Sequence, residues 1–339
     1  MLLCLFEDDR VGGLRPLVET RAAYDLRLGM RTLFETARDA FGPDALALHT
    51  RPMVGPVTAQ AHDEATVNAL PDGADVLCVN GRFVAEQGPA LQQIQERAQS
   101  SESARAFVQN DTLVAAWVPE AANRLPSDVL SAAPFPPSAV GDLPTTTLTN
   151  ATLVERPWDL LNTLRPALER DVAARTDGPT SRPLSARPQA TVHNSAVGVC
   201  PDHIYFGQDA TVRPGAILNA EQGSIYVGAE ATVHERAVVK GPCYVGPKTQ
   251  IKVGADIEGS AFGYYCKVGG EVHDTVIHSL SNKSHPGFLG HSYLGRWCNL
   301  GADTNNSNLK NNYGEISAYA PTDEAFVPTG RQFAGLFMG

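Results

Sequence analysis

Aliphatic residues recur at every sixth position over one long stretch of this chain. They are Val227, Val233, Val239, Val245, Ile251 and Ile257. Four positions after each of them comes a small residue: Ala231, Ala237, Cys243, Thr249, Ala255 and Ala261. This period fits neither an amphipathic helix nor an ordinary strand, and a short fixed repeat is typical of a solenoid. It predicts a parallel β-helix in which three hexads make one triangular coil, with aliphatic residues inside and small residues at the corners.

The same register continues on both sides of this stretch. Upstream, Phe206, Val212 and Leu218 begin hexads whose small positions hold Ala210, Ala216 and Gln222, before a slip at residues 223–225. Downstream, Phe288, Leu294 and Leu300 begin hexads whose small positions hold Ser292, Cys298 and Thr304. Residues 262–287 break the period, so we expect them to leave the coil as loops that bind ligands. The alternative is a β-helix that serves only as a spacer or trimerisation stalk.

The first half of the chain alternates between strand and helix patterns. We expect strands at 2–6, 45–49, 75–79, 104–108 and 113–118, and helices at 30–41, 90–98 and 158–174. This alternation predicts an α/β domain with a mostly parallel sheet. A segment rich in Pro and Gly follows, which places the domain limits at 1–178 and 188–339 with a linker at 179–187.

Composition narrows the class of protein. The formal net charge of -10 disfavours a nucleic-acid partner, whose phosphates would be repelled. No apolar run is long enough to cross a bilayer, and the run Met1–Phe6 lacks the basic flank of a signal peptide. We therefore expect a cytoplasmic protein without a membrane partner. The six cysteines include no Cys-x-x-Cys pair, which favours buried reduced thiols over disulfides or a zinc site.

The loop after the first strand is the first candidate for ligand binding, because parallel sheets bind ligands beyond the carboxyl ends of their strands. This loop, Glu7–Arg21, contains Gly12, Gly13, Arg15 and Arg21. Flexible backbone amides and guanidinium groups suit a phosphate. An ordinary turn is the alternative explanation of the two glycines.

Several motifs carry a family resemblance. The stretch Gly12-Gly13-Leu14-Arg15-Pro16-Leu17 resembles a shortened signature loop of sugar-1-phosphate nucleotidyltransferases. Such a domain before a hexapeptide helix is similar to the bifunctional glucosamine-1-phosphate acetyltransferase and N-acetylglucosamine-1-phosphate uridylyltransferase. Further resemblance to its acetyltransferase part lies in Ser284-His285, Phe288-Leu289-Gly290 and Asn299-Leu300-Gly301. A divergent branch, described as sugar nucleotidyltransferases of the Bacteroidetes type, is matched by 288–295, 308–313, Asn80-Gly81-Arg82 and Pro157-Trp158-Asp159.

The resemblance implies a transferase of amino-sugar nucleotide biosynthesis. It implies acetyl transfer from acetyl-CoA to glucosamine 1-phosphate, nucleotidyl transfer from a nucleoside triphosphate to a sugar 1-phosphate with Mg²⁺, and products such as UDP-N-acetylglucosamine. A left-handed β-helix assembled as a homotrimer is implied as well. The alternative is a non-catalytic protein that binds a sugar phosphate or nucleotide on a trimeric scaffold. A metal enzyme of the carbonic anhydrase type is disfavoured, because His234, His273, His278 and His291 share no single hexad position.

The resemblance also assigns residues to the acetyltransferase reaction. His285 falls at the catalytic base, and a neutral imidazole suits that role near pH 7. Asn299 falls at a sugar contact. A second family Asn corresponds to Asn312, followed by Tyr313, if the motif is matched, or to Asn308 if residues are counted without a gap. Such amides would bind sugar hydroxyls or an oxyanion. The alternative is an asparagine ladder or turn in the solenoid.

The chain departs from the family at two positions of this site. Phe288 replaces a Tyr, and His273 replaces a phosphate-binding Lys. Lys252, Lys267 or Lys283 would have to supply the missing charge, although lysines are usually solvated surface residues.

The nucleotidyltransferase part departs from the family at the position of the metal ligand. The family holds the divalent ion with an Asp in a Gly-Asp motif, and Arg82 stands at that place. Asp8, Asp9 and Asp25 are the remaining carboxylate candidates, whereas Arg15, Arg21 and Arg82 would bind phosphate. The domain is therefore either a protein that only binds its ligand or an enzyme that uses other carboxylates.

The apolar run at residues 333–339 lacks the polar capping of a solenoid end. The family's coil continues past this point, and later turns complete its acetyl-CoA site. We therefore expect a β-helix truncated at its C-terminus, with the acceptor side present and the CoA side incomplete.

Overall fold

The computed structural model describes residues 1–71, 75–100, 103–121, 129, 133–176, 182–186 and 189–339. The chain divides into two compact units. The first is Met1–Leu26 with Thr32–Glu155, and the second is Arg27–Arg31 with Arg156–Gly339. In the described part, no helix is both long and apolar enough to cross a membrane.

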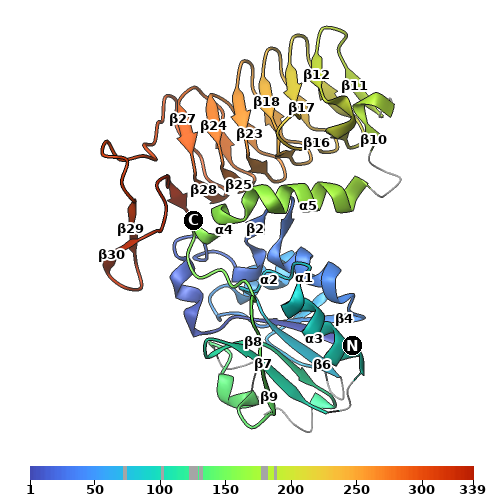
Figure 1. Ribbon diagram of the computed structural model, residues 1–339, viewed down its shortest axis with the longest axis vertical. Helices are drawn as coiled ribbons and strands as arrows, with labels where there is room; N and C mark the ends of the chain where they lie inside the picture. Colours follow the sequence, from blue (N-terminus) through green and yellow to red (C-terminus); the bar gives the residue numbers. More distant parts are fainter. Residues whose placement is uncertain (72–74, 101–102, 122–128, 130–132, 177–181, 187–188) are drawn as a thin grey trace. The chain divides into compact units, whose positions relative to one another are not determined.

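The first unit is built on one seven-stranded sheet with the order β5-β4-β1-β6-β8-β7-β9. Its strands are β1 Leu2–Phe6, β4 Ala45–Leu48, β5 Ala65–Val67, β6 Val76–Asn80, β7 Arg105–Gln109, β8 Thr112–Val118 and β9 Thr145–Thr147. Strands β5, β4, β1 and β6 are parallel, β8 is antiparallel to both β6 and β7, and β9 is parallel to β7. The predicted α/β domain with a mostly parallel sheet is confirmed (Figure 1).

Among the described residues of this unit, three α-helices accompany the sheet: α1 Leu33–Phe41, α2 Gly55–Ala61 and α3 Pro89–Ser100. Short 3-10 helices lie at η1 Asp9–Leu14, η2 Ala23–Asp25 and η4 Pro137–Val140. A capping box starts α1, because the Thr32 hydroxyl accepts the Glu35 amide at 3.1 Å and the Glu35 carboxylate accepts the Thr32 amide at 2.7 Å. The helix ends at Gly42, whose φ of 54° is left-handed.

The second unit is a coil of three stacked parallel sheets, followed from end to end in Figure 1. The first sheet contains β13 Ile204–Phe206, β16 Ile225–Val227, β19 Cys243–Val245, β22 Ala261–Phe262, β25 Val276–Ser279, β28 Tyr293–Arg296 and β31 Phe337–Met338, with β10 Arg182–Pro183 antiparallel at its edge. The second contains β11 Ala190–Val192, β14 Ala210–Val212, β17 Thr232–Val233, β20 Gln250–Ile251, β23 Lys267–Val268 and β26 Asn282–Lys283. The third contains β12 Val197–Val199, β15 Ile217–Asn219, β18 Val238–Lys240, β21 Asp256–Glu258, β24 Glu271–His273 and β27 Phe288–Gly290.

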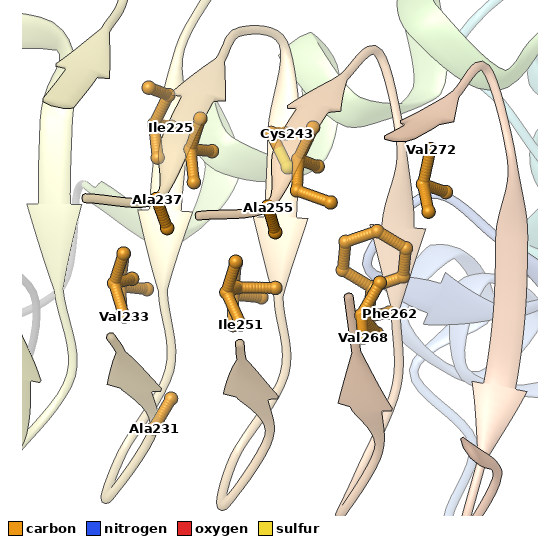
Figure 2. Close-up of a cluster of buried hydrophobic side chains, with 14 of the residues drawn as sticks. Ile225, Ala231, Val233, Ala237, Cys243, Ile251, Ala255, Phe262, Val268 and Val272 are labelled. Carbon is orange, nitrogen blue, oxygen red and sulfur yellow. The ribbon is translucent and has the colours of Figure 1, made fainter. Parts of the chain in front are cut away.

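The hexad pattern describes the coil correctly over residues 227–261. Val227 pairs with Val245, Val233 with Ile251 and Val239 with Ile257, so each coil contains three hexads. All twelve predicted interior and corner residues of this stretch are buried. Figure 2 shows Val233, Ile251 and Val268 in successive coils, pointing into the same interior. These stacked sheets are consistent with the predicted left-handed β-helix.

The expectation that residues 262–287 leave the coil as loops is wrong. Phe262 pairs with Ile277 and Val268 with Lys283, so the coil continues with fifteen residues instead of eighteen. Left-handed residues stand at corners both in this segment, as at Asp274 with φ 47°, and in the regular coils, as at Arg236 with φ 59°. In the downstream hexads, Leu294 and Leu300 lie in the core as predicted, but Leu289 lies there in place of Phe288.

Helices α4 Asp159–Asn162 and α5 Leu164–Thr176 belong to this second unit. Arg165 of α5 forms ion pairs with Asp274 at 2.6 Å and Glu258 at 3.1 Å. Glu169 accepts the amide and hydroxyl of Ser224 at 2.8 and 3.0 Å. The short strands β2 Arg27–Leu28 and β3 Arg31–Thr32 form a two-stranded sheet. In that segment, the Arg31 guanidinium reaches Asp171 of α5 at 2.6 Å.

The structure describes only residues 182–186 of the predicted linker at 179–187. Residues 179–181 and 187 lie outside the described residues. The rest form β10 and the 3-10 helix η5 Leu184–Ala186, and another short helix, η6 Pro201–His203, follows β12.

Asparagine side chains cover the last edge of the third sheet. The Asn305 carboxamide accepts the Phe288 amide at 2.7 Å, and the Asn306 carboxamide accepts the Gly290 amide at 3.2 Å. These side chains, together with the Asn306 backbone amide that donates to the Phe288 carbonyl at 3.0 Å, replace the next strand on β27. A hairpin, β29 Ser317–Ala320 with β30 Ala325–Pro328, follows before the apolar C-terminal run returns to the coil as β31, paired with β28.

All six cysteines lie in the described part, and none forms a disulfide. Five are buried and Cys200 is exposed, so the expectation of buried thiols fails at this one residue. Burial raises the pKa of Cys243 to about 12.

Candidate functional site

Three parallel strands of the first unit end at one edge of the sheet. Glu7 and Asp8 follow β1, Arg51 follows β4 two residues after His49, and Arg82 follows β6. Because the strands are parallel neighbours, their carboxyl ends lie together, and this is where such sheets bind ligands. This group of residues is the sheet-edge site.

Arg82 forms an ion pair at this edge with the buried carboxylate of Asp8. Its Nε and Nη2 donate to the two carboxylate oxygens of Asp8 at 2.9 and 2.6 Å, while Nη1 donates to the Val154 carbonyl at 3.1 Å. Asp8 also accepts Asn80 Nδ2 at 2.9 Å. Arg82 is fully buried and Asp8 is 4% exposed. Arg82 therefore forms a forked, buried ion pair inside the unit.

A second ion pair, with a buried carboxylate and a partly buried arginine, joins β1, β4 and the loop that contains Arg15 and Arg21. Glu7, fully buried, accepts Arg51 Nε at 3.0 Å, the Thr50 hydroxyl at 2.8 Å and the Ala23 amide at 2.9 Å. Arg51 Nη2 donates to the carbonyls of Val18 and Arg21 at 2.7 and 3.0 Å. This pair therefore fixes the path of the arginine-containing loop over the sheet edge.

The loop itself begins as a 3-10 helix, Asp9–Leu14, that contains Gly12 and Gly13, both half-buried. Arg15 follows it with a half-exposed side chain and an ion pair to Glu19 at 3.2 Å. Arg21 is 5% exposed and donates from Nη2 to the Thr20 hydroxyl at 3.0 Å. Of these two cations, Arg15 is the one whose side chain reaches solvent.

The residues at this edge do not fit the magnesium ion that the family resemblance implies. Arg82 and Asn80 already occupy the oxygens of Asp8, whereas Asp9 is exposed on the 3-10 helix. Asp25 contacts His62 Nε2 at 2.7 Å. Although burial acts to lower the pKa of His62, this hydrogen bond and the charge of Asp25 raise it. Among the described residues, there is no group of three or more His, Cys, Asp or Glu side chains that could hold a metal ion.

The predicted acetyltransferase residues lie in the last coils of the second unit. His285 is exposed at a corner. Its carbonyl accepts Lys283 Nζ at 2.7 Å, and the Gly269 carbonyl accepts the same amine at 3.0 Å. Lys283 is only 2% exposed and points into the interior column that Val268 and Ile251 occupy in earlier coils. Burial lowers the pKa of Lys283, and the amine is enclosed beneath the His285 corner.

His273, Phe288 and Asn308 are brought together around Gly290. His273 pairs with Gly290 in the third sheet, and its ring meets the edge of the Phe288 ring with centroids 6.1 Å apart. Asn308 Nδ2 lies 2.8 Å from Nδ1 of His291. Because an amide nitrogen donates, that ring nitrogen accepts in neutral His291.

His291 is partly buried beside Phe333 and Asp274. It stacks on Phe333 with centroids 5.0 Å apart, and its Nε2 lies 3.6 Å from Asp274 Oδ2. Burial lowers the pKa of His291, while the charge of Asp274 acts to raise it. Both ring nitrogens thus face protein groups.

The remaining predicted residues are dispersed. Asn299 is exposed, and its backbone forms an isolated parallel β-bridge with Asn282 of the preceding coil. Asn312 is exposed and accepts the Gly314 amide at 3.0 Å, and Tyr313 is 68% exposed. Lys267 is half-buried, and Lys252 Nζ lies 3.4 Å from Gln250 Oε1. The structure does not gather these residues around His285.

Four residues were not predicted from the sequence as site residues. Glu7 and Arg51 belong to the sheet-edge site, and Asp274 and His291 belong to the last coils of the β-helix. Glu7 and Arg51 could have been found from the sequence, because Glu7 directly follows a predicted strand and Arg51 lies within three residues of the end of another. Asp274 carried no comparable signal, since its corner belongs to the segment that breaks the hexad period.

Comparison with known proteins points to the first unit. A family model described as sugar nucleotidyl transferase matches residues 3–180. This match covers more than half of the chain and includes the sheet-edge site, Arg15 and Arg21. It confirms the expected similarity to sugar nucleotidyltransferases. A search of curated proteins found no match.

Proposed function

The chain belongs to the sugar nucleotidyl transferase family, and on that premise we propose that its first unit transfers a nucleotidyl group from a nucleoside triphosphate to a sugar 1-phosphate. An oxygen of the sugar phosphate attacks the α-phosphorus, the bond to the β-phosphate breaks, and pyrophosphate leaves. We infer that the sugar is an amino sugar, that UDP-N-acetylglucosamine is the model product, and that the protein acts in the cytoplasm.

The loop fixed over the sheet edge is the observation that supports this proposal. Arg51 holds the carbonyls of Val18 and Arg21 in place, so the loop is ordered before a ligand binds. Arg15 presents a half-exposed guanidinium from this loop. A guanidinium offers a planar pair of donors that matches a phosphate. The edge is therefore suited to the phosphates of a nucleotide or a sugar phosphate.

Replacing Arg15 by alanine should weaken UDP-N-acetylglucosamine binding about 10- to 100-fold, because a hydrogen bond to a charged group contributes roughly 1.5–3 kcal/mol. Isothermal titration calorimetry measures the dissociation constant, and pyrophosphate release from UTP with N-acetylglucosamine 1-phosphate reports turnover. Arg38→Ala is the matched control, since Arg38 is equally exposed but lies on α1, away from the sheet-edge site. Equal effects of the two substitutions would contradict a role for Arg15 in binding.

The alternative for the first unit is ligand binding without turnover. The buried Asp8–Arg82 pair favours it, because this pair occupies the carboxylate that would otherwise hold a catalytic cation. Both functions predict the effect of Arg15→Ala on binding, whereas only the first predicts pyrophosphate release.

A second candidate function concerns the β-helix: acetyl transfer from acetyl-CoA to glucosamine 1-phosphate in a homotrimer. The grouping of His273, Phe288 and Asn308 around Gly290 favours it, since three residues of the family resemblance meet there. His285 would take the proton of the sugar amine as that amine attacks the thioester carbonyl, and the CoA thiolate would leave.

Replacing His285 by alanine should lower release of CoA thiol with glucosamine 1-phosphate about 100-fold or more, the usual contribution of a general base. His203→Ala is the matched control, because His203 is also an exposed histidine but belongs to η6 in an early coil. Thiol release that is the same in both variants would refute the assignment of the base.

A further inference from the structure

We infer that the sheet-edge site binds its nucleotide without a divalent cation held by the protein, because the ion pair of Arg82 with Asp8 takes the place of that cation. The part that concerns the nucleotide rests on the proposed function. The part that concerns the cation rests on the residues alone.

Three donors from Arg82 and Asn80 already occupy the Asp8 carboxylate. Oδ2 accepts both Arg82 Nη2 at 2.6 Å and Asn80 Nδ2 at 2.9 Å, and Oδ1 accepts Arg82 Nε at 2.9 Å. A divalent ion at these oxygens would meet the guanidinium across a few ångströms and be repelled by it. Asp8 is thereby excluded as a metal ligand while Arg82 stays in place.

Two further hydrogen bonds fix Arg82 beside Asp8. Its third nitrogen donates to the Val154 carbonyl at 3.1 Å, and its backbone amide donates to Asn80 Oδ1 at 3.0 Å. The side chain is fully buried. Moving the guanidinium away would leave both charges buried without partners, which is strongly unfavourable.

The neighbouring carboxylate, Glu7, is occupied as well. Oε2 accepts three donors, the Thr50 hydroxyl at 2.8 Å, the Arg51 amide at 2.9 Å and Arg51 Nε at 3.0 Å. Oε1 accepts the Ala23 amide at 2.9 Å. Both buried carboxylates at this edge therefore have guanidinium partners.

These pairs change what the edge offers to a polyphosphate. Two carboxylates that would repel phosphate are neutralised by fixed charges, so no exchangeable cation is needed to remove the repulsion. Positive charge for the phosphates then comes from the loop that contains Arg15 and Arg21. Ligand affinity should accordingly not depend on the magnesium concentration.

Two measurements on the wild-type protein test this inference. Electron paramagnetic resonance of Mn²⁺ should show that added protein does not reduce the signal of the free ion. Calorimetry with UDP-N-acetylglucosamine should give dissociation constants in EDTA and in MgCl₂ that agree within about twofold. Stoichiometric Mn²⁺ binding that Asp8→Asn abolishes would overturn the inference, and so would UDP-N-acetylglucosamine binding that is lost in EDTA.

A substitution makes the test sharper. In Arg82→Asp the guanidinium is removed and a second carboxylate is added, so this variant should bind Mn²⁺ and melt at a higher temperature when Mn²⁺ is present. If it does not fold, the wild-type measurements still decide. Absence of nucleotide binding in both buffers, with no Mn²⁺ bound, would refute the proposed function but leave the conclusion about the cation intact.

Discussion

Replacing Arg82 by methionine should lower the free energy of unfolding of the first unit by about 3–5 kcal/mol, the cost of leaving one charge of a buried pair without its partner. Asp8 would keep Asn80 as a donor but lose both hydrogen bonds from the guanidinium. The Val154 carbonyl would lose its donor too. Urea denaturation followed by circular dichroism measures the change.

Two further variants distinguish the effect of losing this ion pair on stability from the effect of removing any arginine. Arg38→Met removes an exposed arginine whose nearest carboxylate, Asp39, lies at 3.8 Å, and it should change stability by less than about 0.5 kcal/mol. In Arg82→Met combined with Asp8→Asn, the uncompensated charge disappears, so the loss should be smaller than in Arg82→Met alone. An Arg82→Met variant as stable as the wild type would show that this pair is not needed to hold the edge together.

Truncating Phe262 to alanine should destabilise the β-helix by about 3–5 kcal/mol, as for other buried phenylalanines. Phe262 is fully buried in the interior column between Val245 and Ile277. The closed coil leaves its neighbours little freedom to fill the space, so a cavity should remain. Figure 2 shows the Phe262 ring inside the coil, close to Val268.

Phe326→Ala is the matched control for this substitution, because Phe326 lies on the hairpin strand β30 and is 73% exposed. We expect a loss below about 1 kcal/mol there. Thermal unfolding of both variants, compared with wild type, gives the difference. Similar losses at the two positions would contradict the burial of Phe262 in a closed coil.

The coils could be predicted because a local spacing determines which residues point inward. From Val227 to Ala261 every interior position follows from the one six residues before it, and no distant contact is required. The same rule fails at residues 262–287, where paired strand residues are fifteen positions apart instead of eighteen. A search for hexads registers this shortening as a break, although the strands continue.

Lys283 illustrates a second limit of pattern reasoning. A lysine in a polar stretch is expected on the surface, yet its register with Val268 directs the side chain inward. Two carbonyls, of Gly269 and His285, make this position tolerable for an ammonium. Neither the register nor the carbonyl partners can be recognised from the local sequence.

The sheet-edge site was predictable in its location but not in its pairing. The loop that contains Arg15 and Arg21 follows the first strand, and the place of Arg82 after β6 was recognised from its motif. Asp8 and Arg82, however, are 74 residues apart, and Glu7 and Arg51 are 44 apart. Such pairings depend on the order of strands in the sheet, which local patterns do not determine.

Direct detection of the product tests nucleotidyl transfer by this protein most simply. The wild-type protein is incubated with UTP and N-acetylglucosamine 1-phosphate, and phosphorus NMR follows the two substrates. We expect the diphosphate signals of UDP-N-acetylglucosamine and of free pyrophosphate to appear together in equal amounts, and both to be reduced in Arg15→Ala but not in Arg38→Ala. Binding of UDP-N-acetylglucosamine without any pyrophosphate, across a panel of nucleoside triphosphates and sugar 1-phosphates, would contradict nucleotidyl transfer and establish a binding protein instead.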